Sequence, residues 1–224
     1  PVYYVFFKSH DVEIMQHALN EYAHLKLQHN PTKAAAQETG LAEGTPVIVG
    51  TVDAAAEAVS VGVVSPGQMM VMYGSTIFMI EVLDQPKSDP RLWSARYLFP
   101  GTHCMMAGMA TSGALTRWFR DNFAPDLIAA QEQTGANAYA QLTKEAATVS
   151  PGSDGIIMLP YCSGERTPIN DPLAKGTVIG LSLAHTRGHL YRAVLEGVGY
   201  GINHHFDVLQ EIGATPDTVV AVGG

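Results

Sequence analysis

The sequence predicts an α/β fold, because short apolar segments typical of strands alternate with segments of helical periodicity. Residues 68–73 and 77–83 are strand-like runs joined by a short turn. Residues 186–212 carry apolar side chains every three or four positions, the pattern of one helix face. A hydrophobic fraction of 46% and a charged fraction of 15% suffice for a buried core. Such alternation favours a sheet covered by helices.

The other elements follow from local patterns. Before the turn we expect strands at 2–7 and 46–49 and helices at 14–25, 34–39 and 54–64. After it we expect a helix within 108–123, a helix at 137–148, a buried strand at 155–159, a polar loop at 161–175, a strand at 178–183, the helix at 186–212 and a strand at 218–222.

Two of these helices carry further expectations. Leu115, Trp118 and Phe119 should lie on one side of the helix within 108–123. Three glycines lie close together inside the helix at 186–212, and each costs about 1 kcal/mol relative to Ala in a helix interior. We therefore expect a neighbouring helix to approach its backbone closely at Gly197, Gly199 and Gly201.

Charge and hydropathy argue against two classes of partner. Acidic residues outnumber basic ones by 21 to 13, a net charge of −8, and the basic residues form no stripe that could follow a phosphate backbone. The longest apolar stretch, 69–83, is interrupted by a Gly-Ser-Thr turn and by Glu81. It therefore falls short of a bilayer span. We expect neither nucleic acid nor a membrane as a partner.

Cysteine usage and the chain ends bear on location and completeness. The two cysteines, Cys104 and Cys162, are far apart in the sequence, which favours a reducing compartment and predicts a cytoplasmic protein. No basic-then-apolar signal segment is present. The chain starts at Pro1 and ends on a glycine pair that would normally open a turn, so we expect a portion of a longer protein.

Asp53 is the strongest candidate for a catalytic residue. It follows the expected strand at 46–49 and precedes the expected helix at 54–64, a position where α/β proteins gather functional groups. A carboxylate there can accept a proton from a substrate hydroxyl. The alternative is a structural N-cap, because Asp is favoured at that position whatever the function.

Gly74, Ser75 and Thr76 form a candidate phosphate-binding turn. They offer backbone amides and two hydroxyls, and the glycine leaves room for close approach. An ordinary tight turn is the alternative. Neither a P-loop nor a Gly-x-Gly-x-x-Gly fingerprint occurs in the sequence.

Two other chemistries find no support. His185 and His189 are four residues apart, but Thr186 stands where a zinc protease has Glu, and no third ligand has suitable spacing. We expect structural or capping roles for these histidines and for His204 and His205. Ser163 lies outside a Gly-x-Ser-x-Gly elbow, which argues against acyl transfer.

Four segments, in this order, resemble the FGGY family of carbohydrate kinases, the group of xylulokinase, ribulokinase, gluconokinase and glycerol kinase. Residues 44–53 are similar to the Gly-Thr-Pro-Val strand that ends in the family's catalytic aspartate. Residues 63–76 resemble its second phosphate hairpin, and residues 164–176 contain its Gly-Glu-Arg-Thr-Pro loop. Residues 176–196 satisfy its C-terminal signature at every position.

The resemblance implies the actin-like ATPase, or ribonuclease-H-like, fold. The chain would contain the end of the first kinase domain and most of the second. Residues 1–64 would be a remnant of the N-terminal, sugar-binding domain, with 1–30 unassigned. Residues 65–224 would be an incomplete C-terminal, nucleotide-binding domain. Members of the family often form dimers through this second domain, so the resemblance leaves a homodimer as an open alternative.

The implied function is ATP-dependent phosphorylation of a sugar or polyol hydroxyl. Asp53 would be the general base, and Gly74, Ser75 and Thr76 would hold phosphate oxygens. Gly113, Gly223 and Gly224 would line the nucleotide, with Mg²⁺ bridging its phosphates. Glu165, Arg166 and Asp171 are interpreted as a surface loop held by ion pairs, without a role in the site.

The chain also departs from the family pattern. Thr51-Val52 replaces the glycines that many members have before the aspartate, and Gly-Ser-Thr replaces Gly-Thr-Ser at the turn. The family's opening Asp-x-Gly-Thr hairpin is absent. We therefore expect the chain alone to be inactive. A non-catalytic actin-like regulatory module and an ATP hydrolase are the alternatives, and the identity of the sugar stays open.

Overall fold

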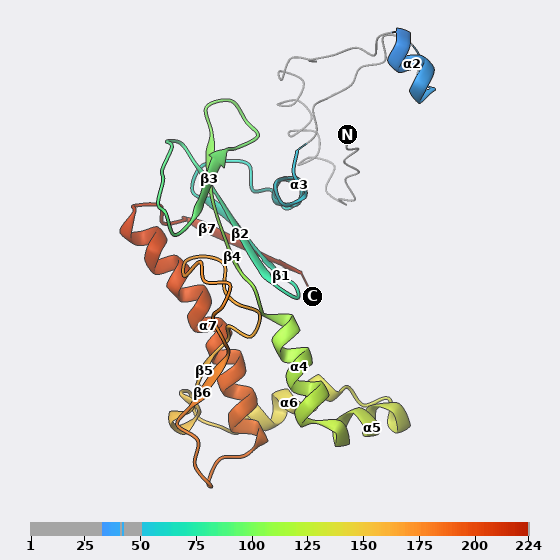
Figure 1. Ribbon diagram of the computed structural model, residues 1–224, viewed down its shortest axis with the longest axis vertical. Coiled ribbons are helices and arrows are strands. Elements are labelled where there is room, and N and C mark those ends of the chain that lie inside the picture. Colours follow the sequence, from blue (N-terminus) through green and yellow to red (C-terminus); the bar gives the residue numbers. More distant parts are fainter. Residues whose placement is uncertain (1–32, 41, 43–50, 224) are drawn as a thin grey trace.

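The computed structural model describes residues 33–40, 42 and 51–223 (Figure 1). The strands expected at 2–7 and 46–49 and the helix expected at 14–25 lie outside the described residues. The short helix expected at 34–39 is confirmed as α2, Lys33–Thr39. The helix expected at 54–64 is α3, Asp53–Ser60, which ends four residues earlier than predicted.

A five-stranded mixed sheet forms one half of the molecule. Its strand order is β3-β4-β2-β1-β7. All neighbouring strands are antiparallel except β1 and β7, which are parallel. The strands are β1 Gln68–Tyr73, β2 Ile77–Leu83, β3 Trp93–Arg96, β4 His103–Met109 and β7 Thr218–Gly223. The predicted hairpin of β1 and β2 and the predicted last strand are confirmed, whereas β3 and β4 were not predicted.

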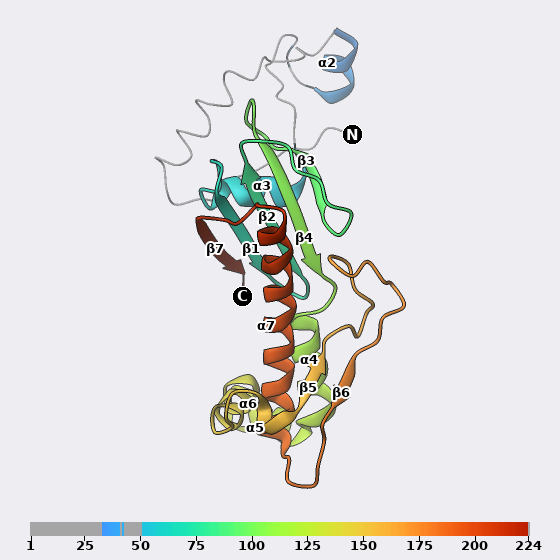
Figure 2. The same ribbon diagram turned by 90° about the vertical axis from the view of Figure 1, so that its left-hand side faces the viewer.

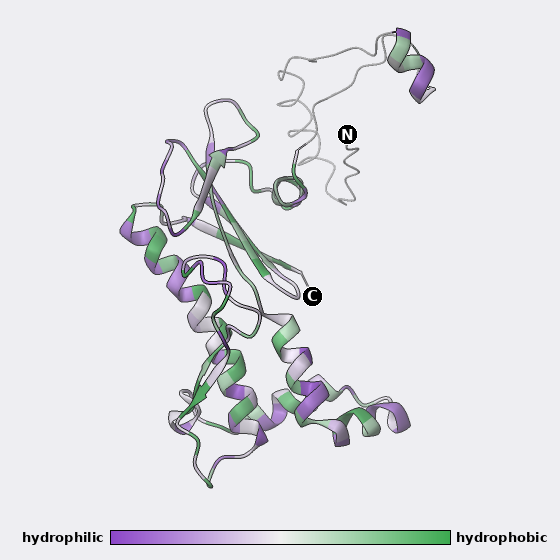
Figure 3. Ribbon diagram, viewed as in Figure 1, coloured by the Kyte–Doolittle hydropathy of each residue, from purple (hydrophilic) through white to green (hydrophobic). Residues whose placement is uncertain are grey.

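The two faces of the sheet are covered by different helices, because successive strand residues point to opposite sides. Met69 and Val71 pack in the cluster that includes Val208 of α7, Arg187–Glu211. Met70 packs on the other face, in the cluster that includes Ala58 of α3. Figures 1 and 2 show α7 along one face and α3 against the other. Figure 3 shows that hydrophobic residues are concentrated along the strands of this sheet.

The other half of the molecule is built around the N-terminal part of α7. Helices α4 Gly113–Phe123, α5 Pro125–Thr134 and α6 Ala138–Ala147, and the two-stranded sheet of β5 Ile157–Leu159 and β6 Thr177–Ile179, belong to it. Leu115, Phe119 and Leu142 are buried with Tyr191 and Val194 of α7. Helix α7 thus connects this half to the sheet, as Figure 2 shows.

Several details differ from the sequence-based expectations. Trp118 does not share the buried side of Leu115 and Phe119, since it is 46% exposed. Helix α5 was not predicted. The strand expected to be buried at 155–159 is shorter, and its Ile157 is 51% exposed. The strand expected at 178–183 is limited to β6.

Of the three glycines with this expectation, Gly197 and Gly201 meet a strand and a side chain rather than the expected neighbouring helix. A Cβ at Gly197 would overlap the Met158 carbonyl of β5, and one at Gly201 would overlap the Met109 side chain of β4. A Cβ at Gly199 would meet nothing within 4 Å. Close approach therefore explains two of the three glycines.

This difference predicts opposite stability effects along one helix. Gly199→Ala should raise the free energy of unfolding by about 0.5–1 kcal/mol, because Ala loses less backbone entropy in a helix. Gly197→Ala should lower the free energy of unfolding by ~1–3 kcal/mol, because the backbone of β5 must move. Urea unfolding of the two variants measures both. A stabilising Gly197→Ala would contradict the described packing of β5 on α7.

Candidate functional site

The tip of the β1–β2 hairpin presents polar groups with no described partner. The Gly74 amide donates to the Thr76 carbonyl over 2.9 Å and closes the turn. Ser75 is exposed, and neither its hydroxyl nor that of Thr76 makes a hydrogen bond to another described residue. A Cβ at Gly74 would meet only the Thr76 carbonyl oxygen, at 3.6 Å, so the space beside Gly74 is open. The tip can therefore accept a group that receives hydrogen bonds, such as a phosphate.

The start of α4 is held against this tip by backbone hydrogen bonds. The Ser112 and Ala114 amides donate to the Ser75 carbonyl, and the Gly113 amide donates to the Gly74 carbonyl, over 2.9 to 3.1 Å. These bonds satisfy amides that a helix N-terminus leaves without intrahelical partners. The hairpin tip and the N-terminus of α4 thus form one unit.

Gly113 is required by this contact. A Cβ at Gly113 would lie 2.6 Å from the Gly74 carbonyl oxygen, a distance that real Cβ atoms do not adopt. The structure therefore gives the glycine a packing reason. The nucleotide-lining role expected for Gly113 stays a prediction.

The end of β7 lies beside the tip as well. Gly223 is the register partner of Tyr73, the last residue of β1, and its φ of +112° suits glycine alone. A Cβ there would overlap the Tyr73 carbonyl. Gly224, the other glycine of the expected nucleotide-binding pair, lies outside the described residues. The structure therefore brings the hairpin tip, Gly113 and Gly223 together, although they are distant in sequence.

Asp53 lies elsewhere. It is the first residue of α3 and is exposed, and its Oδ1 accepts a hydrogen bond from the Ala54 amide over 2.8 Å. The N-cap position belongs to Val52, so the alternative of a plain N-cap aspartate does not describe this residue. Figure 1 shows α3 toward the end of the sheet away from the hairpin tip. The described part of the chain does not bring Asp53 to the tip.

Glu165 was misread from the sequence. The structure buries it to 5% exposure, and no ion pair joins it to Arg166 or Asp171 among the described residues. The interpretation as a surface loop held by ion pairs is therefore wrong for Glu165 and for the ion pairs, whereas Arg166 and Asp171 are exposed as expected. Instead, the Glu165 amide donates to the Asp171 carbonyl, and Glu165 Oε1 accepts the Ala110 amide. The signal in the sequence that could have pointed to an unusual environment for Glu165 is the Gly-Glu-Arg-Thr-Pro motif itself.

His189 and His205 have the structural roles that the sequence predicts for them. His189 accepts a hydrogen bond from the Thr186 amide at Nδ1 and completes a capping box at the start of α7. His205 is buried, with Nε2 2.8 Å from the Thr167 carbonyl oxygen and Nδ1 2.7 Å from that of Gly201. Burial lowers the pKa of His205. Among the described residues, no group of three or more His, Cys, Asp or Glu side chains could hold a metal ion.

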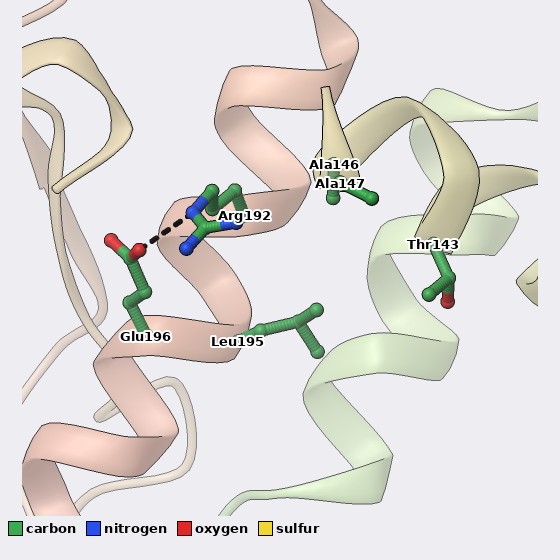
Figure 4. A pocket seen from close by; sticks show the side chains of 6 residues that line it. All are labelled: Thr143, Ala146, Ala147, Arg192, Leu195 and Glu196. Atoms are coloured by element: carbon green, nitrogen blue, oxygen red, sulfur yellow. Dashed lines mark hydrogen bonds and ion pairs between the residues drawn. The ribbon is translucent and has the colours of Figure 1, made fainter. Parts of the chain in front are cut away.

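A separate hollow of about 310 Å³ lies between α6 and α7 and is shown in Figure 4. Its lining residues are Thr143, Ala146, Ala147, Arg192, Leu195 and Glu196. None of the candidate site residues lines it. Arg192 and Glu196 form an ion pair at its edge over 2.7 Å. Their polar groups are thus already paired within the protein.

Gly74→Ala distinguishes a phosphate-binding tip from an ordinary turn. The added methyl group meets no protein atom closer than 3.6 Å, so the unfolding free energy should change by less than about 0.5 kcal/mol. The methyl group would occupy the space that a phosphate needs. We expect about tenfold weaker ATP binding to the full-length protein, measured by titration calorimetry. Unchanged ATP affinity in the folded variant would contradict the assignment of the tip.

The fold and the hairpin define an α/β domain of the actin-like ATPase class. The family model of the "FGGY family of carbohydrate kinases, C-terminal domain" matches residues 69–224. The crystal structure of xylulose kinase from Rhodospirillum rubrum matches with a TM-score of 0.76 and 39% identity, covering 88% of this chain and 38% of that one. The chain belongs to the FGGY family of carbohydrate kinases, and the predicted actin-like fold is confirmed.

Curated relatives agree with this membership. The chain is 33% identical to gluconokinase from Bacillus subtilis (strain 168) over 199 residues, which are 88% of this chain and 39% of the relative. It is 34% identical to xylulose kinase from Escherichia coli (strain K12) over 181 residues, which are 80% of this chain and 35% of the relative. The chain therefore spans less than two fifths of the length of these kinases.

No helix among the described residues is long and apolar enough to cross a membrane. The two cysteines are both free; Cys104 is buried and Cys162 is exposed.

Proposed function

We propose that this chain is part of an ATP-dependent kinase that phosphorylates a hydroxyl of a sugar or polyol. The observation that carries the proposal is the family match across residues 69–224, which include the hairpin tip. The relatives are named as gluconokinase, xylulose kinase and ribulokinase. They favour a small carbohydrate substrate without selecting one.

ATP is the proposed phosphate donor, and the tip fits its phosphates. Ser75 and Thr76 would donate hydroxyl hydrogen bonds to phosphate oxygens, and the open space beside Gly74 would admit them. Gly113, Gly223 and Gly224 would lie along the nucleotide. Positioning and charge neutralisation supply most of the catalysis in phosphoryl transfer.

Mg²⁺ is proposed from the chemistry of ATP rather than from a ligand set. The described residues provide no cluster of carboxylates that fits a metal ion. Mg²⁺ would neutralise charge on the phosphates when bound with ATP.

Asp53 is the proposed general base. Its carboxylate is exposed, so a substrate hydroxyl can reach it. It would accept the hydroxyl proton as the oxygen attacks the γ-phosphorus, and ADP would leave with the electrons of the broken bond. Because α3 lies away from the tip in Figure 1, ATP and sugar would have to bridge the two groups, or the domains would have to close.

We propose that residues 1–64 belong to the N-terminal domain of this kinase and residues 65–224 to its C-terminal domain. The start of the family match at Met69 supports this division. The two free cysteines support a cytoplasmic location. A homodimer is compatible with the proposal.

The test is ADP release by the full-length protein across ketoses, polyols and aldonates. We expect one of these substrates to stimulate ADP release at least tenfold above the rate without sugar. Nucleotide binding without any sugar dependence would instead indicate a regulatory actin-like module. Sugar-independent ADP release would indicate an ATP hydrolase.

A further inference from the structure

Glu165 is a buried acid with only one of its two carboxylate oxygens in use. Oε1 accepts the amides of Ala110 and Arg166, each over 2.7 Å. Oε2 is buried and has no hydrogen-bond partner among the described residues. Burial raises the pKa of Glu165, whereas the two amides and the charge of Arg166 lower it. A buried carboxylate that is half satisfied costs free energy, so its presence needs a local explanation.

The explanation lies in the residue that Oε1 contacts. Ala110 connects the end of β4 to the N-terminus of α4. The amides of the next residues, 112–114, are those that hold the carbonyls of the hairpin tip. The Glu165 side chain thus acts on the segment that fixes the tip, at a distance of two residues along the chain.

The loop of Glu165 holds this segment at two further points. The Gly108 amide donates to the Thr167 hydroxyl over 2.7 Å, and the Thr111 hydroxyl donates to the Pro160 carbonyl. Thr167 and Thr111 are both buried. The Thr167 hydroxyl also donates to the Gly108 carbonyl over 3.2 Å. Residues 160–167 therefore contact residues 108–111 by four hydrogen bonds, of which only the one from Ala110 involves a charged side chain.

We propose that Glu165 is a positioning residue of the phosphate site: by accepting the Ala110 amide it holds the start of α4 in the position that keeps the hairpin tip ready for nucleotide phosphates. The inference rests on the proposed function, because it takes the tip as the place where ATP phosphates bind. In this role Glu165 would not itself contact substrate or nucleotide. It acts through the backbone.

Three substitutions of Glu165 in the full-length protein test the assignment. Glu165→Gln keeps an acceptor at Oε1 and removes the charge. Glu165→Asp keeps the charge and withdraws the carboxylate by about 1.5 Å. Glu165→Ala removes both. Titration calorimetry with ADP should show about tenfold weaker binding for the Asp and Ala variants and near-native binding for the Gln variant.

Adenosine, which has no phosphate, separates the positioning role from a general loss of structure, because a general loss would weaken adenosine binding as well. We expect its affinity to be unchanged in all three variants. The matched control is Glu196→Ala, which removes a carboxylate that accepts the Gly152 amide at 3.0 Å in the other half of the molecule. It should lower thermal stability without changing ADP affinity. If Glu165→Ala does not fold, the ADP affinities of the Asp and Gln variants still test the positioning role.

The outcomes separate the inference from the proposed function. If the unmodified protein binds no ADP, the proposed function fails first. If it binds ADP and Glu165→Asp binds equally well, the positioning role is overturned while the kinase proposal stands. Equal losses of ADP affinity in the Gln and Asp variants would also overturn the positioning role. They would show that the hydrogen bond from the Ala110 amide does not determine ADP affinity.

Discussion

Asp53→Asn is expected to reduce sugar phosphorylation by the full-length kinase by about 10²–10⁴-fold in kcat. An amide has nearly the shape of the carboxylate but cannot take up the hydroxyl proton. The one hydrogen bond of the Asp53 side chain to a described residue is accepted at Oδ1 from the Ala54 amide, and Asn can accept it as well. The buried face of α3, which includes Ala55, Ala58 and Val59, is not altered. The loss should therefore appear in kcat, with the KM for ATP unchanged.

Glu57→Gln is the matched control for this prediction. Glu57 is an exposed acid in the same helix, and its neutralisation should leave kcat within about twofold. Initial rates with the preferred sugar and saturating ATP measure both variants. A loss of less than tenfold in Asp53→Asn would remove Asp53 from the role of general base.

Glu81→Gln is expected to stabilise the fold strongly at alkaline pH. Glu81 lies in β2 at 1% exposure, and its Oε2 has no hydrogen-bond partner among the described residues. Burial raises its pKa from 4.5 to about 8; the charge of Lys87 lowers the pKa and that of Asp217 raises it. The folded protein therefore keeps a proton that the unfolded chain releases.

The sign of the pH dependence follows from this difference. Between about pH 4.5 and pH 8 the unfolded state binds fewer protons, so the unfolding free energy falls as pH rises. The slope reaches about 1.4 kcal/mol per pH unit, and the accumulated difference is on the order of a few kcal/mol by pH 8. Glu81→Gln removes this contribution. The advantage of the variant should grow from near zero at pH 4.5 and level off above pH 8.

Urea unfolding from pH 5 to pH 9 measures the effect as the difference between the variant and the unmodified protein, in which the other titrating groups cancel. Glu132→Gln, at an exposed position of α5, should give no such slope. A constant difference between Glu81→Gln and the unmodified protein over this range would mean that Glu81 is ionised in the fold.

The hairpin and α7 could be predicted because their signals are local. The β1 and β2 runs are separated by Gly74-Ser75-Thr76, and α7 repeats its apolar residues over 25 positions. Strand β3 has four exposed residues and no local pattern, so only its pairing with β4 defines it. Strand β4, His103–Met109, contains no β-branched residue and is fixed by its register with β2.

The candidate site also has one part that could be predicted from the sequence and one part that could not. The residues of the tip are contiguous, so their polar turn was visible in the sequence. Their contact with Gly113 and Gly223 depends on strand pairing and helix packing across the fold, and no local pattern encodes it. Glu165 was missed because acids are usually exposed, and only the docking of its loop onto Ala110 buries it.

Direct detection of a sugar phosphate is the sharpest test of phosphate transfer from ATP to a sugar. The full-length protein would be incubated with ATP labelled in the γ-phosphate and with the sugar that stimulates ADP release most. We expect the label in a sugar phosphate, in amounts equal to the ADP formed, and not in inorganic phosphate. Label recovered only as inorganic phosphate, or retained in ATP for every sugar, would contradict the assignment as a carbohydrate kinase.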